Sequence, residues 1–500
     1  MLNVQSLFGT LEEQLELLAR DGTHEDVIAS FKQAFEQLRR LHLTKKLSFN
    51  KSKAKGYGLE SLEQIFINVG YKLSYLFQKF NDKNYEEALV VVRELKGLQF
   101  WYADETQAVE EEKRRIKEQI VQVDRDLVRV IEENGLDDPV DFINITNEAD
   151  EKVKFLEALG DGKVYNPVFE YDPINSELLT HAEAYTNGVM RQLRDINVDL
   201  KVGWGRIVEK KRINIETVLK LIRSIGNARK ITKYSKMLYG FPSDKMIEDV
   251  IRIIKSGNSP NISKKYGFSP DQIKAEFTRV VESLGLDNRK YNIEDVKDVL
   301  ERIFREEDIN WTVVVKTDKD MLPRWKTVNV KREIWINKNK EPFSKEDIVK
   351  CIQHEVRAHI IRSEKGGEGV AKYGTGGYLP TEEALAGYNE AVVGVGDNDP
   401  MSVYAYVVAE SVAAKGSFYD CYLTLANLGI SEETIWKVVV RIKRGLSKTK
   451  KAGGFFKDHV YYLGDRVLKQ FIASGGDVED LKEGKIGVND VEHIIGEYRL

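Results

Sequence analysis

Segments typical of β-strands occur in only one short window of this chain. They are 311–315 (WTVVV), 327–330 and 333–337 (EIWIN), rich in β-branched and aromatic residues and separated by turn residues. Because the three runs are short and closely spaced, we expect one small antiparallel sheet. The rest of the patterned sequence is helical, so the predicted fold is α+β and predominantly helical.

The helical pattern is clearest before residue 135. Between 116 and 131, apolar residues recur at steps of three and four, which marks one face of a helix. Asn134-Gly135 provides a typical helix end. The pattern weakens over 135–170, and helical periodicity returns over 174–305 and 400–500.

Length and periodicity together predict more than one domain. A chain of 500 residues is too long for one compact core. We place the boundary in the weakly patterned stretch. The prediction is an all-helical N-terminal domain over 1–160 and a catalytic domain over 161–500.

Composition excludes several classes of protein. The net charge of −4 gives no overall attraction to nucleic acid or to an anionic membrane. No stretch of about 18 apolar residues is present, and the N-terminus lacks the pattern of a signal peptide. Only Cys351 and Cys421 carry thiols, which fits a reducing compartment. We expect a cytoplasmic protein that binds neither nucleic acid nor membrane.

Two of the seven histidines, His354 and His359, lie five residues apart in an HExxxH sequence. A helix is expected here, because Ser344 and Asp347 form a capping-box pattern and Gly366-Gly367 can end the helix. Residues five apart sit roughly 140° apart on an ideal α-helix. Both imidazoles can reach one ion only if the helix contains an extra residue, so we predict a π-bulge within 355–359.

Catalytic zinc takes three protein ligands and one water. Two are expected to be His354 and His359, and the segment PTEEALAGYNE offers Glu382, Glu383 and Glu390 as carboxylates for the third position. Glu355 is then free to act as the general base toward a water on the ion. The sequence therefore predicts one Zn²⁺ per chain, with the third ligand open among these glutamates.

Several separated motifs resemble a known family, the HExxxH metallopeptidases that include the microtubule-associated tyrosine carboxypeptidases and the bacterial QEGLA-motif proteins. The resemblance covers roughly 165–485. It is carried by YNPVFEY (165–171), LYGFPS (238–243), HEVRAHIIR (354–362), YLPTEEALA (378–386), and RIKRGL with GGFFKDHVYYLG (441–464).

The resemblance implies specific roles and a zincin-like catalytic domain. In that family the two histidines and the second glutamate of the TEE segment bind zinc, which maps onto His354, His359 and Glu383. The catalytic glutamate maps onto Glu355. The implied activity is removal of a single C-terminal tyrosine or glutamate. Arg357 stands where the family usually has a small residue, and Ala384 stands where it usually has glycine, which bears on specificity.

A carboxypeptidase must also hold the carboxylate of its substrate, and arginine suits this role because its two donors match the two oxygens. The candidate substrate-binding residues, some in a basic wall for an acidic peptide tail, are Arg324, Arg357, Arg362, Arg441, Lys443, Arg444, Lys457 and Tyr461. The expected partner is a peptide or protein C-terminal tail.

Two alternatives remain at this point. Other HExxxH enzymes act from the N-terminus, so a zinc dipeptidyl peptidase or an endopeptidase would use the same motif. A non-catalytic interaction protein that keeps the metal site is the other alternative, with the helical N-terminal region as its binding part.

Overall fold

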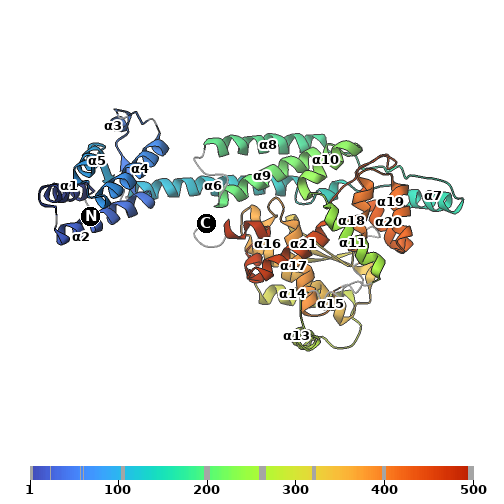
Figure 1. Ribbon diagram of the computed structural model, residues 1–500. Helices are drawn as coiled ribbons and strands as arrows, with labels where there is room; N and C mark the ends of the chain where they lie inside the picture. The colour runs from blue at the N-terminus through green and yellow to red at the C-terminus, as the bar shows by residue number, and fades with distance from the viewer. Residues whose placement is uncertain are drawn as a thin grey trace. The chain divides into compact units, whose positions relative to one another are not determined.

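The computed structural model describes residues 4–22, 24–56, 58–59, 61–102, 107–195, 203–257, 266–317, 323–396 and 401–493. Its contacts divide the chain into two compact units, Met1–Arg115 and Ile116–Leu500 (Figure 1). This division lies upstream of the boundary expected at residue 160. The reason is visible at Phe155, whose ring packs 5.2 Å from that of Phe418 and 5.6 Å from that of Trp436, inside the second unit.

The first unit is mainly helical. Helix α1 packs against α2 and α5, and α5 packs against α4 around an apolar core. A short β1 pairs antiparallel with β2, Leu47 opposite Tyr102, so the expectation of an all-helical region was incomplete. The elements are α1 (Val4–Asp21), α2 (Glu25–Leu43), β1 (Leu47–Phe49), α3 (Lys51–Gly56), α4 (Leu62–Asn81), α5 (Tyr85–Gly97) and β2 (Phe100–Tyr102).

The second unit is also dominated by helices, which confirms the predicted fold class. Its helices before the sheet are the part of α6 (Gln107–Asn134) from Ile116 onward, η1 (Pro139–Phe142), α7 (Glu148–Gly160), α8 (Ser176–Asp195), α9 (Gly203–Ile222), α10 (Ala228–Tyr239), α11 (Asp244–Ser256), α13 (Pro270–Ser283) and α14 (Ile293–Glu306). Helix α6 ends at Asn134, as the sequence predicts, and is followed by Gly135 with a φ of 62°.

The three predicted strands form one sheet in the order β3-β5-β4. They are β3 (Thr312–Lys316), β4 (Trp325–Val328) and β5 (Glu333–Asn337). Strand β4 pairs antiparallel with β5, but β3 pairs parallel with it. The prediction of a purely antiparallel sheet is therefore wrong, because the chain places β5 between the two earlier strands rather than adding it at an edge. Ile334 and Ile336 of β5 are fully buried in the core beneath the sheet.

The HExxxH sequence lies in the helical segment that follows the sheet. Ser344 caps α15 (Lys345–Cys351) through a capping box with Asp347, as predicted. The helix continues as the π-helical segment η4 (Ile352–Ile360) and then as α16 (Ile361–Lys365), which ends at Gly366.

Helix α17 (Leu379–Val392) begins after Tyr378, which takes its N-cap position. Thr381 of its first turn is buried, and its hydroxyl accepts a hydrogen bond from the backbone N–H of Val488. Pro380 stands in the first turn, where a missing N–H costs little. Figure 1 shows α17 beside α21 (Val460–Ala473). A Cβ at Gly464 of α21 would lie 2.0 Å from the carbonyl oxygen of Pro380, so this close approach requires glycine.

The last helices before α21 are α18 (Met401–Ala413), α19 (Phe418–Asn427) and α20 (Glu432–Lys443). Segment η4 lies between two cores: Val356 and Ile360 belong to the core under the sheet, while Ala358 belongs to the core shared with α17. None of the helices in the described ranges is long and apolar enough to cross a membrane.

Candidate metal centre

The π-helical segment brings the two motif histidines together. In a π-helix the backbone hydrogen bonds run from residue i to i+5, so side chains five apart lie one above the other. The rings of His354 and His359 are accordingly 4.9 Å apart, centroid to centroid, at 75°. The predicted bulge is confirmed, and it extends over nine residues, Ile352–Ile360, rather than the five expected.

Each imidazole is oriented by a different glutamate of α17. The Nδ1 atom of His354 lies 2.9 Å from Glu390 Oε1, and that of His359 lies 2.7 Å from Glu382 Oε1. With both Nδ1 atoms engaged, Nε2 is the nitrogen left to bind a metal. Carboxylates in this position fix the tautomer and orientation of metal-binding histidines.

The remaining glutamate of the segment, Glu383, joins the histidines directly. One ligand atom each from His354, His359 and Glu383 can be chosen so that all three lie within 4.8 Å of one another. Two imidazole nitrogens and one carboxylate oxygen form the donor set of catalytic zinc sites that keep a fourth position open. The sequence could not choose the third ligand among Glu382, Glu383 and Glu390, and the structure gives each of them a different environment.

The electrostatics of the cluster favour a cation. Burial by itself lowers the pKa of His354, but the hydrogen bond with Glu390 and the neighbouring charges outweigh it and raise that pKa to about 9. Those charges belong to Glu355, Glu390 and Glu383. So many carboxylates beside one imidazole make a positive ion at this point favourable.

Glu382 is itself held in a buried ionic group, here called the Glu382 cluster: Glu382, Arg362 and Lys485. Arg362 Nη1 donates to Glu382 Oε2, and Lys485 Nζ lies 2.9 Å from Glu382 Oε1. Arg362 also donates to the backbone carbonyls of Leu481 and Ile486, each at 2.7 Å. Although burial raises the pKa of Glu382, the two cations and His359 together lower it. The carboxylate therefore stays charged toward His359.

Glu355 is positioned by the sheet. It is buried, and the hydroxyl of Thr327 on β4 donates a hydrogen bond to its Oε2 atom. This hydrogen bond engages one of the two carboxylate oxygens of Glu355. Glu355 follows His354 directly on η4, and it therefore lies beside this candidate metal ligand.

A second buried ionic group, here called the Asp458 cluster, consists of Asp458, Arg441 and Arg444. Arg441 donates to both carboxylate oxygens of Asp458, at 3.0 and 2.6 Å, and Arg444 Nη2 lies 3.6 Å from the same group. Arg441 also lies over the ring of Tyr406, 5.2 Å from its centroid. Despite burial, the two arginines lower the pKa of Asp458 to about 2.

Tyr461 interacts electrostatically with this cluster and with Glu383. The charge of Glu383 is the largest cause that raises the pKa of Tyr461, and Arg441 and Asp458 act on it as well. Its ring stacks on that of Tyr406 at 6.3 Å. Tyr461 therefore keeps its proton within electrostatic range of Glu383 and Arg441.

Two other predicted substrate-binding residues lie in the interior. Arg362 and Lys443 are fully buried, and Lys443 donates to the carbonyls of Gly416, Lys451 and Gly453. Their part in substrate binding stays a prediction.

Three further candidates are engaged by acids. Arg357 pairs with Glu307, Arg324 lies 3.1 Å from Asp347, and Lys457 lies 3.2 Å from Asp138. The ion pair of Arg357 with Glu307 involves none of the candidate metal ligands. Tyr461 is the candidate that interacts with Glu383, while Arg441 and Arg444 are grouped around Asp458.

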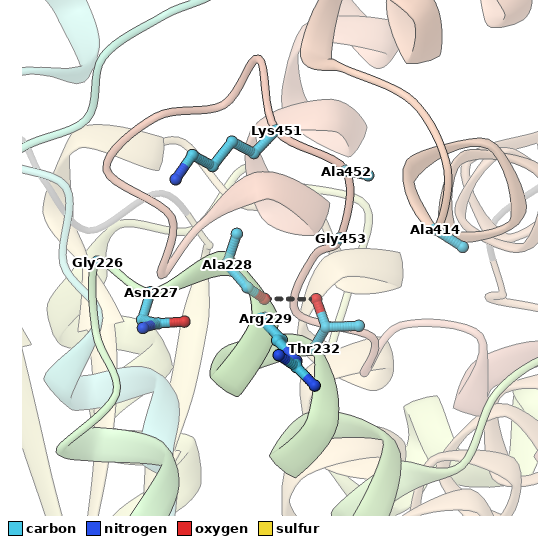
Figure 2. A pocket seen from close by; sticks show the side chains of 9 residues that line it. All are labelled: Gly226, Asn227, Ala228, Arg229, Thr232, Ala414, Lys451, Ala452 and Gly453. Carbon is cyan, nitrogen blue, oxygen red and sulfur yellow. Dashed lines mark hydrogen bonds between the residues drawn. The ribbon is translucent and has the colours of Figure 1, made fainter.

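The segment 441–457, which is rich in lysine and arginine, also contributes to a pocket of about 450 Å³ that is separate from the candidate metal centre (Figure 2). Its lining comes from the start of α10, the end of α18 and the loop after α20: Gly226, Asn227, Ala228, Arg229, Thr232, Ala414, Lys451, Ala452 and Gly453. None of the three metal-binding residues is among them. Lys451 thus lines this pocket, and Asp458, Arg441 and Arg444 do not.

Sequence reasoning missed the roles of Thr327, Lys485 and Arg362, and the use of Glu382 and Glu390 as histidine partners. The first two lie in segments with no recognised chemistry. A signal was present for the glutamates, since metal-binding histidines commonly need a carboxylate on the second nitrogen.

The fold and the cluster define an α+β protein in which the two histidines of an HExxxH sequence and Glu383 could hold a metal ion. Residues 154–498 match the family described as microtubule-associated tyrosine carboxypeptidase, and because this is more than half of the chain, the protein belongs to that family. The chain is similar to microtubule-associated tyrosine carboxypeptidase 1 from Mus musculus, at 30% identity over 154 residues. That alignment covers 29% of this chain, and it spans about a third (32%) of the length of the mouse protein.

Proposed function

We propose that the protein is a zinc-dependent carboxypeptidase that removes one residue, tyrosine or glutamate, from the C-terminus of a peptide or protein tail. The observation that carries this proposal is the convergence of His354, His359 and Glu383 within 4.8 Å, beside Glu355. Family membership supports the reaction class. Zinc bound there would supply Lewis acidity, which polarises a peptide carbonyl and makes water more acidic.

The residues of the chain would divide the remaining work. Glu355, held at one oxygen by Thr327, takes the proton from the attacking water with its other oxygen and delivers it to the leaving amine. Tyr461, kept protonated beside Glu383, can donate a hydrogen bond to the oxygen of the scissile carbonyl.

The Asp458 cluster is the proposed receptor for the substrate carboxylate. Arg441 has 38% of its side chain exposed, and the Nε atom of Arg444 has no hydrogen-bond partner in the described part of the chain. Two guanidinium groups against one acid leave positive charge for a second carboxylate, which suits a C-terminus and an acidic tail. The two buried thiols, Cys351 and Cys421, are consistent with the cytoplasmic location that we propose.

The test is a mass-spectrometric assay on peptides that differ only in the last residue. We expect trimming of one residue, loss of activity with a chelator, and recovery with Zn²⁺. Glu355→Gln should keep stoichiometric zinc while the rate falls roughly 10²–10⁴-fold. The matched control, Glu364→Gln, changes a glutamate of the neighbouring α16 and should keep full activity.

The competing activities give different results. A peptide with an amidated C-terminus should not be cleaved; equal cleavage of the amide and the free acid would overturn the carboxypeptidase and favour an endopeptidase or a dipeptidyl peptidase. Stoichiometric zinc without turnover on any peptide of the set would leave the non-catalytic interaction protein.

A further inference from the structure

A second large concavity lies in the first unit, between α2 and α4. This groove has a volume of about 960 Å³, which is in the range of sites that accept several large side chains. Its lining residues are Lys32, Phe35, Glu36, Arg39, His42 and Leu43 of α2, and Ile67, Gly70, Tyr71, Leu73, Ser74 and Phe77 of α4.

The floor of the groove is built from packed side chains. The rings of Phe35 and Phe77 stack at 5.1 Å across the two helices, and Leu73 is buried between them and the core. A Cβ on Gly70 would lie 3.1 Å from His42 Nε2, so the glycine lets this ring lie against α4. The floor is therefore a formed surface.

The rim of the groove is apolar and exposed. Leu43, Ile67 and Tyr71 have relative exposures of 66%, 53% and 74%. Single exposed apolar residues are common, but here three large ones border one groove. Covering them would remove apolar surface from water, which favours association with another apolar surface.

The charges of the groove come only from α2. Lys32 makes no ion pair in the part of the chain that the structure describes, and Arg39 lies 3.5 Å from Glu36. The lining residues of α4 carry no charge. One cation is thus left without a balancing acid on the α2 side.

We propose that this groove binds an amphipathic helix of a partner protein, with its apolar face on Ile67, Tyr71 and Phe77 and an acidic residue toward Lys32. Helices bind in such grooves through apolar residues at i, i+3 or i+4, and i+7. A second copy of the same groove is a poor occupant, because the acid among its lining residues, Glu36, already lies beside Arg39 and leaves no second acid for Lys32. This inference is independent of the proposed peptidase activity.

The experiment uses the full-length protein and three fluorescent peptides of 18 residues. The first is an amphipathic helix with leucine on one face and glutamate at its edge; the second has lysine in place of glutamate; the third has the composition of the first in scrambled order. Fluorescence anisotropy gives the Kd, and hydrogen exchange locates the protected helices. Ile67→Ser/Tyr71→Ser tests the apolar rim, Lys32→Glu tests the charge, and Leu17→Ser, an exposed leucine of α1, is the matched control.

We expect saturable binding of the acidic amphipathic peptide with protection of α2 and α4. Ile67→Ser/Tyr71→Ser should weaken it at least tenfold, Leu17→Ser should leave it unchanged, and Lys32→Glu should shift the preference toward the lysine peptide. Equal binding of the scrambled peptide, or no binding, would overturn the proposal. Concentration-dependent dimerisation that Ile67→Ser/Tyr71→Ser abolishes would also overturn it, because the occupant would then be a second copy.

Discussion

The Glu382 cluster and the Asp458 cluster are both buried carboxylates held by two cations, yet they differ in access to solvent. In the first, Arg362 is fully buried and uses its remaining donors on backbone carbonyls. In the second, 38% of the Arg441 side chain and 13% of the Arg444 side chain are exposed. The Glu382 cluster is closed, because its arginine is fully buried, and it can only position a neighbouring residue. The Asp458 cluster is open, because its Arg441 is partly exposed, and it can also bind a ligand.

The largest expected effect follows from the closed cluster. Replacing Arg362 by Met leaves Glu382 with Lys485 as its only cation and leaves the carbonyls of Leu481 and Ile486 without their donor. Removing one partner of a buried pair typically costs about 3–5 kcal/mol. Urea unfolding should show a loss of this size. The matched substitution in the Asp458 cluster, Arg441→Met, should lower the free energy of unfolding clearly less. An equal loss would contradict the distinction between the closed and the open cluster.

Metal affinity should separate the two histidine partners. Glu382 is anchored by two cations, while Glu390 has Lys350 at 4.0 Å. Loss of a partner of this kind weakens metal binding by about 10–100-fold. We expect Glu382→Gln to lie at the upper end of this range and Glu390→Gln at the lower end, in competition titrations with a zinc-sensitive dye. The reverse order would mean that anchoring of the carboxylate is not what matters.

The pH dependence of stability should report the Asp458 cluster. The pKa of Asp458 is lowered from 3.8 to about 2, which corresponds to about 2 kcal/mol of stability. Because the folded-state pKa is the lower one, this contribution is present above pH 3.8 and disappears as the pH falls toward 2. The difference in unfolding free energy between the zinc-free native protein and Asp458→Asn should shrink over that window. A constant difference would contradict the assignment.

The smallest expected effect tests the open cluster as a receptor. Arg441→Lys keeps the charge but loses the paired donors, which should raise KM for a C-terminal peptide about tenfold, or about 1.4 kcal/mol. Zinc content should not change, and kcat should change less than KM. Arg252→Lys, an exposed arginine of α11, is the matched control. A fall in kcat at constant KM would assign Arg441 to positioning instead.

Much of the candidate metal centre could be predicted, because its geometry depends on the spacing of residues that are close in sequence. A five-residue interval between histidines demands a π-turn if both are to face one ion, and η4 has that geometry. The capping box at Ser344 and the helix end at Gly366 were predictable for the same reason, since they depend on neighbours within one turn. The direction of β3 was not, because strand pairing depends on segments distant in sequence.

The roles of the basic residues were also beyond the sequence. Arg362, Lys443 and Arg441 look alike in a sequence, but burial assigns the first two to the interior and leaves the third accessible. Burial depends on which helices pack together, and long side chains have no periodicity that reveals it.

The helical stretches, the positions of the three strands and the pair of histidines that must share one face could be predicted from local sequence patterns. The choice among Glu382, Glu383 and Glu390 depends on tertiary packing. Adjacent residues on a helix point about 100° apart, so the packing of α17 against η4 sets which carboxylate joins the histidines and which ones support them.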